Sequence, residues 1–351
     1  MRPRVLCGVL AAVALSVTAC GGGGDGRRAD TADGNRPGYP VTVSDCDGRR
    51  TTFHRPPEKI VTSNAAGLEM LFWLGAGDKV VGTGFPPGRG TLPAAFADRA
   101  ARVPVLGRTV IAKERLLGSG ADLYVDTFSS MRNMGGGVDG PRPEEFRAAG
   151  IKHVYLRSTA CAGSLRGERT DLSQVEEDIL ELGRVTGTSP RAAELVAGMR
   201  RKTGAVRSAL AGVARSERPT YFFFDYDAGT EQPLAVCGRQ VANAVITLAG
   251  GRNVFAGCEG DFTRVGWEDV VAANPDWIQL GVRDRGGAEA NRKAFDEAAA
   301  FLRDHPATKG LTAVREDRLL RIGSERTTIG GVRSADTVRE IARALHPDRV
   351  K

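Results

Sequence analysis

AKERLLGSGADLY at residues 112–124 and GWEDVVAANPDWI at residues 266–278 are the two stretches that decide the fold. In each, a glutamate opens a short helical pattern, an aspartate lies eight residues later, and a strand pattern follows that aspartate at once. A helix that leads directly into a buried strand is the unit from which α/β folds are built. The same order in both halves of the chain predicts two related α/β lobes.

The alternation of strands and helices extends outward from these two stretches. Short apolar runs predict strands at residues 59–62, 79–82, 123–125, 153–156, 221–224, 277–280 and 319–322. Helical patterns separate them, among them residues 241–248 and a last helix at 334–345. Each strand runs into a loop of small or polar residues, and such loops line crevices in open α/β sheets. The sequence therefore predicts an α/β protein of two Rossmann-like lobes; the family resemblance described below implies that the ligand cleft lies between them.

Residues 171–216 interrupt this alternation, because they carry helical spacing and no strand pattern. Apolar residues recur on one helical face from Leu172 to Val185, and a second helical run follows. The segment is too long for a simple crossover between neighbouring strands. We therefore expect a long rigid helix that joins a first lobe (41–170) to a second lobe (217–351). Such a connector implies small movements of the lobes and no wide hinge closure.

The first forty residues predict a signal peptide for export and a flexible tether. Residues 1–19 carry a basic start and an apolar run of signal-peptide length, and small residues precede Cys20. This pattern resembles the lipobox of bacterial lipoproteins, in which the cysteine thiol takes the lipid; the alternative is a plain secretory signal with an incidental cysteine. Residues 20–40 are rich in glycine and polar residues, as flexible tethers are. We expect a protein that is lipid-anchored on the extracytoplasmic face of the cell membrane.

Four cysteines follow the leader: Cys46, Cys161, Cys237 and Cys258. An even number in an exported protein favours disulfides, and the spacing is not that of a zinc site. Cys237 and Cys258 bracket one predicted helix, so we expect them to pair. Cys46 and Cys161 then pair by elimination. The alternative is four free buried thiols.

The composition argues against several classes of protein. With 41% hydrophobic and 26% charged residues the chain is an ordinary globular mixture, and no apolar run approaches the roughly 20 residues that span a bilayer. The net charge of +7 is spread along the chain, so we expect no nucleic-acid partner. The histidines are scattered, so we expect no direct metal site; they are His54, His153, His305 and His346. An extracytoplasmic enzyme and a purely structural lipoprotein are alternative classes, but no G-x-S-x-G or H-E-x-x-H motif supports an enzyme.

Several further motifs stand in a recognisable order along the mature chain. They are RPPEKIV at 55–61, ELGRVTG at 181–187, LAGGRNVF at 248–255, and a stretch from His305-Pro306 to Asp317-Arg318 ahead of the last strand. With the two stretches quoted first, this order resembles the solute-binding lipoproteins of bacterial ABC importers for iron–siderophore complexes, cobalamin and haem. The resemblance implies two α/β lobes bridged by a rigid helix, no cofactor, and a monomer that docks on a permease dimer. It also implies that Glu114 and Glu268, one in each lobe, contact arginines of the permease; the alternative is two acids that are favoured by a helix N-terminus.

Topology selects the residues that face the ligand, because they follow the strands of each lobe. In the first lobe they are Ser63, Asn64, Phe85, Asp126, Phe128 and Ser158; in the second they are Tyr226, Arg239, Arg283, Arg326 and Thr327. The aromatic rings suit stacking on a planar ligand, and the guanidinium groups suit carboxylates, phosphates and catecholates. The alternative for each is a solvated or structural loop side chain.

The cargo that the resemblance favours is a ferric siderophore, because this is the commonest ligand of such proteins. Cobalamin or another corrinoid is the next alternative. Haem would need an axial ligand such as Tyr226 at the cleft. An anionic deazaflavin-coenzyme precursor is a further alternative, since residues 158–161 and 327–333 look similar to those of certain actinobacterial members of the family.

Overall fold

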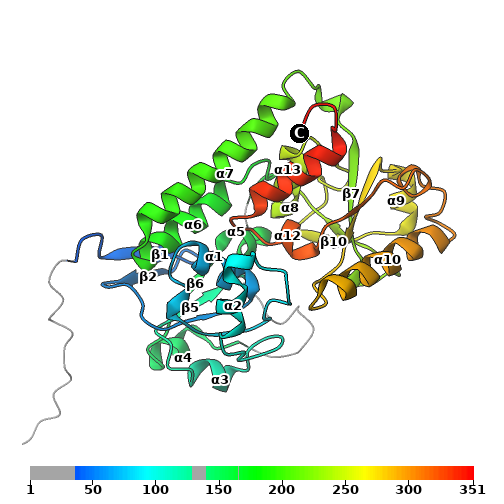
Figure 1. The fold of residues 1–351 in the computed structure, drawn as a ribbon. Helices are drawn as coiled ribbons and strands as arrows, with labels where there is room; N and C mark the ends of the chain where they lie inside the picture. Colours follow the sequence, from blue (N-terminus) through cyan, green and yellow to red (C-terminus); the bar gives the residue numbers. More distant parts are fainter. Residues whose placement is uncertain (1–35, 129–139, 165) are drawn as a thin grey trace, which may run out of the picture. The chain divides into compact units, whose positions relative to one another are not determined.

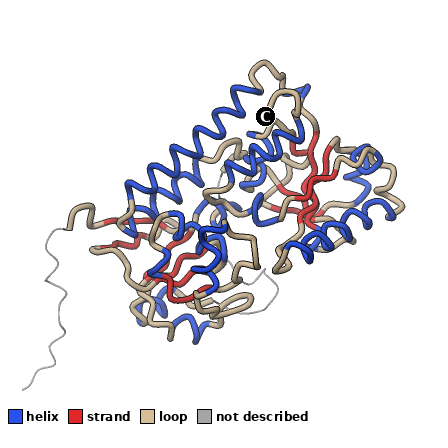
Figure 2. Tube along the Cα trace, viewed as in Figure 1, coloured by secondary structure: helices blue, strands red, loops and turns tan. Residues whose placement is uncertain are grey.

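The computed structural model describes residues 36–128, 140–164 and 166–351 (Figure 1). The predicted signal peptide, the lipidation site Cys20 and most of the tether lie outside the described residues. Within those ranges, no helix combines the length and the apolar character that crossing a membrane requires. The strands fall into two groups with helices packed around them (Figure 2).

The first lobe contains a parallel sheet in the order β4-β3-β5-β6. Its strands are β3 (Ile60–Thr62), β4 (Val80–Thr83), β5 (Leu123–Asp126) and β6 (Lys152–Tyr155), and its helices are α1 (Ala65–Trp73), α2 (Ala94–Ala101), α3 (Lys113–Leu117), α4 (Pro143–Ala148) and α5 (Arg157–Ala160). Because all the pairings are parallel, the four carboxyl ends lie along one edge of the sheet. The four strands predicted for this lobe are all present.

The second lobe contains a parallel sheet in the order β12-β11-β7-β9. Its strands are β7 (Thr220–Asp225), β9 (Arg252–Asn253), β11 (Trp277–Gly281) and β12 (Leu319–Arg321), and its helices are α8 (Val241–Leu248), α9 (Trp267–Ala273), α10 (Ala288–Asp304), α11 (Thr312–Arg315), α12 (Ser324–Thr328) and α13 (Ser334–Leu345). The sheet repeats the parallel arrangement of the first lobe, as the repeated sequence pattern predicts.

The repeated aspartates have the same structural task in both lobes. Asp122 accepts hydrogen bonds from the backbone N–H groups of Glu58 and Lys59, at 2.8 and 3.0 Å. Asp276 accepts from the N–H and the hydroxyl of Thr220, both at 2.7 Å. Each aspartate thus ties the start of a central strand, β5 or β11, to the start of the neighbouring strand, β3 or β7. This shared bond explains why the two stretches carry an aspartate at the same spacing.

The connector consists of two helices, where we expected one long helix. They are α6 (Ser173–Thr186) and α7 (Ser189–Ala209). Gly187 ends α6 in the left-handed conformation, with φ +76°, and the Thr188 N–H donates to Gly183 O at 2.7 Å. A left-handed glycine is a common helix terminator because it has no Cβ to clash. The prediction of one long helix is therefore wrong, because Gly187 ends α6 and a second helix, α7, follows.

One hydrophobic core runs through both lobes along this connector. The same cluster of buried side chains contains Leu71 of α1, Val185 of α6, Val206 of α7 and Ile341 of α13. In Figure 1, α7 lies between α6 and α13, and it packs against both. Wide separation of the lobes would expose this core, at about 25 cal/mol for each Å² of apolar surface. The packing therefore favours small movements of the lobes.

Two antiparallel strand pairs lie outside the central sheets. They are β1 (Val41–Ser44) with β2 (Arg50–Phe53), and β8 (Leu234–Val236) with β10 (Phe262–Arg264). The structure contains two disulfides, Cys46–Cys161 and Cys237–Cys258, with Cα–Cα distances of 5.3 and 5.0 Å. These are the pairs that the sequence analysis expects. The first disulfide ties the turn between β1 and β2 to the end of α5.

Candidate functional site

Ser63 and Asn64 directly follow β3, at the carboxyl edge of the first sheet, and both are buried. The Thr127 N–H donates to Ser63 Oγ at 3.0 Å, and Asn64 Nδ2 donates to Thr127 Oγ1. Asn64 Oδ1 also accepts from the N–H groups of Ala66 and Gly67, both at 3.1 Å, which caps α1. Ser63 and Asn64, both predicted ligand contacts, thus hold the loops after β3 and β5 together and have mainly buried partners within the first lobe.

Phe85 and Phe128 bring two aromatic rings to the same edge. Their centroids lie 6.1 Å apart with an edge-on geometry, and both residues are half-buried. Asp126 positions Phe128 by accepting its N–H at 3.0 Å. Phe85 has a φ of +32°, a region that bulky residues rarely adopt. Strain of this kind is found at binding sites, where the surrounding structure holds it, so the pair is the best-supported ligand surface of the first lobe.

Ser158 is fully buried in α5, the short helix that follows β6. Asp178 of α6, only 5% exposed, accepts the N–H groups of Arg157 and Ser158 at 2.8 and 2.9 Å. Burial raises the pKa of Asp178 to about 7, although these hydrogen bonds act in the opposite direction. Ser158 therefore depends on a buried carboxyl group for its position.

Arg169 is a buried residue that the sequence analysis did not identify. It is 9% exposed, and its Nη1 donates to Ser158 O at 2.5 Å. Burial lowers the pKa of its guanidinium, and the nearby Asp178 raises it. The backbone of Arg169 bonds to the second lobe through Gly238 O, at 2.7 Å, and through Asn243 Nδ2, at 2.8 Å. No local motif marks this residue, because its role depends on the approach of the second lobe.

In the second lobe, polar residues of the loops after β7 and β11 contact one another. Asp227 accepts the N–H of Arg283 at 2.6 Å and pairs with the side chain of Arg285. Asp225, at the end of β7, is buried, and burial raises its pKa. The guanidinium of Arg283 is exposed and forms no ion pair within the described part of the chain. Arg283 is thus the predicted arginine that is most available to an anionic ligand.

The other predicted residues of the second lobe differ in their surroundings. The ring of Tyr226 packs 6.1 Å from those of Phe224 and Phe301. Arg239 Nη1 reaches Gly163 O at 3.3 Å, and this residue is half-buried. Arg326 forms an ion pair with Glu340 of α13 at 2.6 Å, and buried Thr327 accepts from Gln279 Nε2 at 2.8 Å. The structure therefore directs Arg326 and Thr327 toward α13 and the sheet, apart from the group around Arg283.

The carboxyl-edge loops of the two lobes meet. A methyl group added to Gly88, in the loop after β4, would lie 2.7 Å from Gly286 Cα in the loop after β11. The Gly330 N–H donates to Thr159 Oγ1 at 3.1 Å and joins the segment after α12 to α5. Buried polar atoms without a hydrogen-bond partner in the described residues lie on both sides, among them Arg157 Nε, Asp225 Oδ1 and Ser324 Oγ. Buried polar groups normally have partners, so these atoms mark unused hydrogen-bonding capacity in the segments that follow the strands of both lobes.

Glu114 and Glu268 are exposed in the first turns of the equivalent helices α3 and α9. Neither carboxylate forms an ion pair with a described residue. Val271, three residues after Glu268, is 42% exposed, which is high for a large apolar side chain. Both glutamates are therefore accessible to a partner.

No group of three or more His, Cys, Asp or Glu side chains among the described residues is arranged to hold a metal ion.

Comparison with known proteins places the chain in a family. The profile of the family described as "Periplasmic binding protein" matches residues 60–325, most of the chain. An uncharacterised ABC transporter substrate-binding lipoprotein of Bacillus subtilis, YvrC, is 22% identical over 314 residues, which cover 89% of this chain and 88% of the relative. A cobalamin-binding protein of Halobacterium salinarum is 26% identical over 351 residues, which cover 98% of this chain and 85% of the relative.

Two solved structures share the fold over nearly the whole described chain. A periplasmic binding protein from Veillonella parvula superimposes with a TM-score of 0.73 at 25% identity, and the match covers 88% of this chain and 99% of that one. An ABC-type Fe³⁺-hydroxamate transport system protein from Saccharomonospora viridis superimposes with a TM-score of 0.69 at 26% identity, with the same coverage. With its two parallel α/β lobes and its match to the family profile, the chain belongs to the periplasmic binding protein family.

Proposed function

We propose that this protein is the extracytoplasmic substrate-binding lipoprotein of an ABC importer, which captures its ligand between the two lobes and delivers it to a permease dimer. The observation that carries the proposal is the meeting of the carboxyl-edge loops of two parallel sheets, since ligands of α/β proteins bind at such edges. The family membership and the lipoprotein relative from Bacillus subtilis support it. The relatives named above are transport proteins, which supports a binding function and not an enzymatic one.

The ligand we propose is a ferric siderophore. Phe85 and Phe128 offer apolar rings to the organic shell of such a complex, and Arg283 offers an exposed guanidinium to its anionic oxygen atoms. The Fe³⁺-hydroxamate transport protein of Saccharomonospora viridis, similar over 88% of this chain, supports this ligand class.

Cobalamin is the second candidate, because the relative from Halobacterium salinarum is a cobalamin-binding protein and matches 98% of this chain. A corrin ring is planar and would also stack on Phe85 and Phe128. The remaining alternatives are haem, which would require Tyr226 to leave its packing against Phe224 and Phe301, and an anionic deazaflavin-coenzyme precursor, which would use Arg283 and Arg239.

Calorimetric titration of the lipoprotein in neutral detergent tests the ligand class. The probes are a ferric trihydroxamate, cyanocobalamin, haemin and a deazaflavin phosphate. We expect saturable binding of the ferric trihydroxamate, weakened by about tenfold or more in Arg283→Gln and in Phe85→Ala. Arg292→Gln, on the exposed side of α10, is the matched control and should bind as the wild type does. Saturable binding of cyanocobalamin alone would replace the siderophore by a corrinoid, and no binding of any probe would contradict the proposed function.

The attachment of the protein to the membrane through a lipid on Cys20 is a separate prediction. In Cys20→Ala the protein should leave the membrane fraction, because a lipid on this thiol is the only strong membrane anchor that the sequence offers. Fractionation of cells that express the wild type or the variant, with incorporation of labelled fatty acid, measures this directly. A wild type that takes up no label would show that the lipobox prediction is wrong.

A further inference from the structure

A second site lies at the amino edge of the sheet in the second lobe, opposite the edge that carries the proposed ligand loops. There the strands begin around a hollow of about 730 Å³. Arg252 enters it from β9 and Trp277 from β11, while Arg218 and Arg318 precede β7 and β12. Arg349, after α13, completes the wall. The topology thus gathers four arginines that are far apart in the sequence.

The positive charge of these arginines is poorly compensated within the described residues. Arg252 uses Nε to reach Arg218 O at 2.9 Å, which leaves its two terminal nitrogens free. Arg218 Nε is buried without a partner, and its Nη1 lies 3.5 Å from Thr247 O. Arg318 pairs only with Glu316, at 2.7 Å, and Arg349 has no side-chain bond to a described residue. Several guanidinium donors therefore remain for a ligand.

The two carboxylates that line the hollow accept hydrogen bonds from neutral donors and keep their negative charge, so four arginines face two carboxylates. Asp276 accepts the N–H and the hydroxyl of Thr220, both at 2.7 Å, and Glu217 accepts the Ala214 N–H at 3.0 Å. The indole of Trp277 and two prolines add an apolar wall. The hollow therefore combines a surplus of cations with a surface for an organic group.

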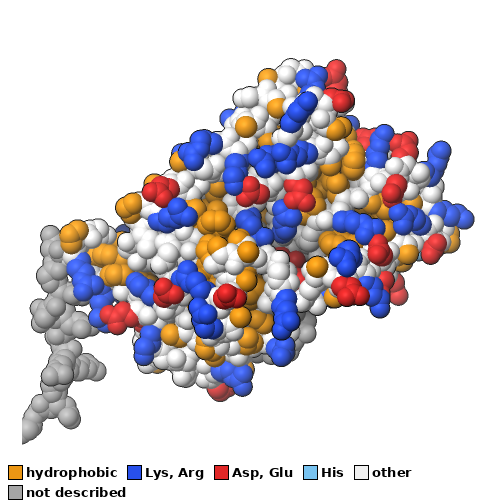
Figure 3. All heavy atoms as spheres, viewed as in Figure 1, with side chains coloured by type: hydrophobic (Ala, Val, Ile, Leu, Met, Phe, Trp, Pro, Cys, Tyr) orange, Lys and Arg blue, Asp and Glu red, His pale blue; other side chains and the backbone are white. Residues whose placement is uncertain are grey.

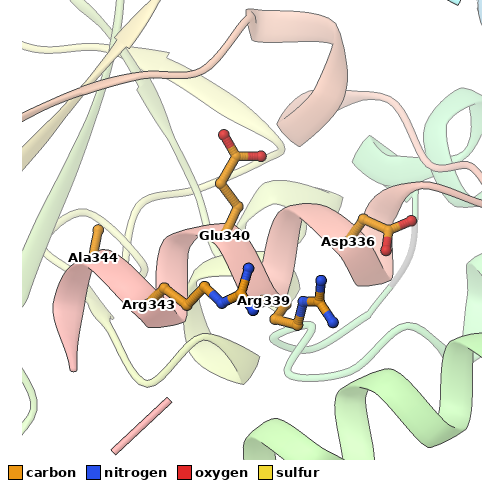
Figure 4. A pocket seen from close by; sticks show the side chains of 5 residues that line it. All are labelled: Asp336, Arg339, Glu340, Arg343 and Ala344. Atoms are coloured by element: carbon orange, nitrogen blue, oxygen red, sulfur yellow. The ribbon is translucent and has the colours of Figure 1, made fainter. Parts of the chain in front are cut away.

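A second hollow, of about 510 Å³, lies beside the first on α13, and Ala344 lines both. Figure 4 shows Arg339 and Arg343 next to each other along α13, with Glu340 extending away from them. The acids of this helix have other partners: Asp336 binds Lys202 and Glu340 binds Arg326, each at 2.6 Å. In Figure 3, basic side chains are interspersed with acidic and apolar ones over the region of α13. Two further arginines, neither of them in an ion pair with a described residue, therefore lie close to the first hollow.

We propose that the hollow at the amino edge binds the phosphate group of an organic ligand. Guanidinium groups pair with phosphate oxygens through two parallel hydrogen bonds, and several arginines around one hollow match a tetrahedral anion that carries more than one charge. Trp277 would contact the organic part. This chemistry fits both a soluble organic phosphate and the head group of an anionic phospholipid, and the site is independent of the interlobe ligand.

The test is a calorimetric titration of the lipoprotein, held in phosphatidylcholine nanodiscs, with inorganic phosphate and with glycerol 3-phosphate at physiological ionic strength. We expect saturable binding, tighter for glycerol 3-phosphate because of the apolar wall. Arg252→Gln/Arg349→Gln should weaken it by about tenfold or more. Arg349→Gln alone is a second variant that should fold normally, since this side chain has no bond to a described residue. It should weaken binding severalfold. Arg147→Gln/Arg292→Gln removes the same charge elsewhere and should have no effect.

Nanodiscs that contain phosphatidylglycerol separate the two sources of phosphate. If the lipid head group occupies the site, the affinity for glycerol 3-phosphate falls in these discs, and this loss disappears in Arg252→Gln/Arg349→Gln. If the affinity is unchanged, the ligand is a soluble organic phosphate. The absence of saturable binding by either probe, or an equal loss in the control variant, would overturn the proposal. Binding of a ferric trihydroxamate is measured in parallel, and its outcome is independent of this site.

Discussion

Two buried ionisable side chains, Asp178 and Arg169, lie where α5, the short helix after β6, meets the second lobe. Asp178 accepts from the backbone at the start of this helix, and Arg169 Nη1 bonds to Ser158 O. Neither residue stands in a motif, and both lie in segments that the sequence assigns to a helix face or a loop. Sequence reasoning identified Ser158 because it follows a strand, but it missed the two charges that hold it, since their partners are distant in the chain.

The stability of the protein should fall as the pH rises from about 4 to about 7, through Asp178. Burial raises its pKa to about 7 in the folded state, while the unfolded chain keeps a value near 3.8. Between these values the folded state holds the proton and the unfolded state does not, so each pH unit removes about 1.4 kcal/mol from the free energy of unfolding. Above pH 7 this loss of stability is complete.

Urea unfolding of the wild type and of Asp178→Asn at pH 5 and pH 7.5 measures this loss. The free energy of unfolding should drop less between the two pH values in the variant than in the wild type. Equal drops would contradict the assignment.

Gly330 is a position where the two lobes approach too closely for a side chain. A Cβ there would lie 2.5 Å from Ser158 Oγ and 2.8 Å from Val175 Cγ2. Gly330→Ala should therefore lower the free energy of unfolding by about 1–3 kcal/mol, through overpacking. Gly331→Ala is the matched control, because no atom lies within 4 Å of its added Cβ. Urea unfolding of both variants gives the comparison, and similar losses at the two positions would refute the packing argument.

At the scale of elements, most central strands were predictable, whereas the two-residue strand β9 and the peripheral strands were not. Buried parallel strands such as β7 form continuous apolar runs, and α13 shows a clear helical face, so both were placed from the sequence. The strands β1, β2 and β10 are short and carry polar residues, β8 is apolar but only three residues long, and α10 has an apolar face built largely of alanine. Their positions depend on packing against the lobes, which a local pattern does not encode. The break of the connector is different, because Gly187 and the second helical run after it are local signals, although we expected one long helix.

The disulfides can be checked directly. Non-reducing peptide mapping of the mature protein should join Cys237 to Cys258 and Cys46 to Cys161, since both pairs have Cα–Cα distances in the range that a disulfide spans. Cys237→Ser/Cys258→Ser should lower the free energy of unfolding by about 2–4 kcal/mol. Alkylation of Cys237 and Cys258 without prior reduction would exclude their bridge.

For the whole molecule, the shared core and the contacts between loops act together. The core along α6, α7 and α13 resists a wide separation of the lobes, while the loops after β4 and β11 meet at the opposite side. If the proposed ligand site is correct, ligand entry requires only small displacements of the loops and side chains around Phe85, Phe128 and Arg283. In the proposed delivery step the permease contacts both lobes at once, and the equivalent helices α3 and α9 each carry one exposed glutamate that could meet it.

Different mutations should therefore impair ligand binding and ligand delivery to the permease. Glu114→Ala and Glu268→Ala should leave ligand affinity unchanged, because both carboxylates lie outside the loops of the site, and should reduce whole-cell uptake, with a larger loss in the double variant. An arginine–carboxylate pair at a transient interface is directional and steers association, so each loss is expected to be severalfold or more.

Glu289→Ala is the matched control, an exposed acid in the first turn of α10 with no ion pair to a described residue. Arg283→Gln should do the opposite, with weaker binding and uptake reduced only in proportion to the ligand bound. Calorimetry and uptake of the same ferric trihydroxamate compare the two. If the glutamate variants lose affinity while transport per bound ligand is kept, these carboxylates belong to the ligand site and the docking role is wrong.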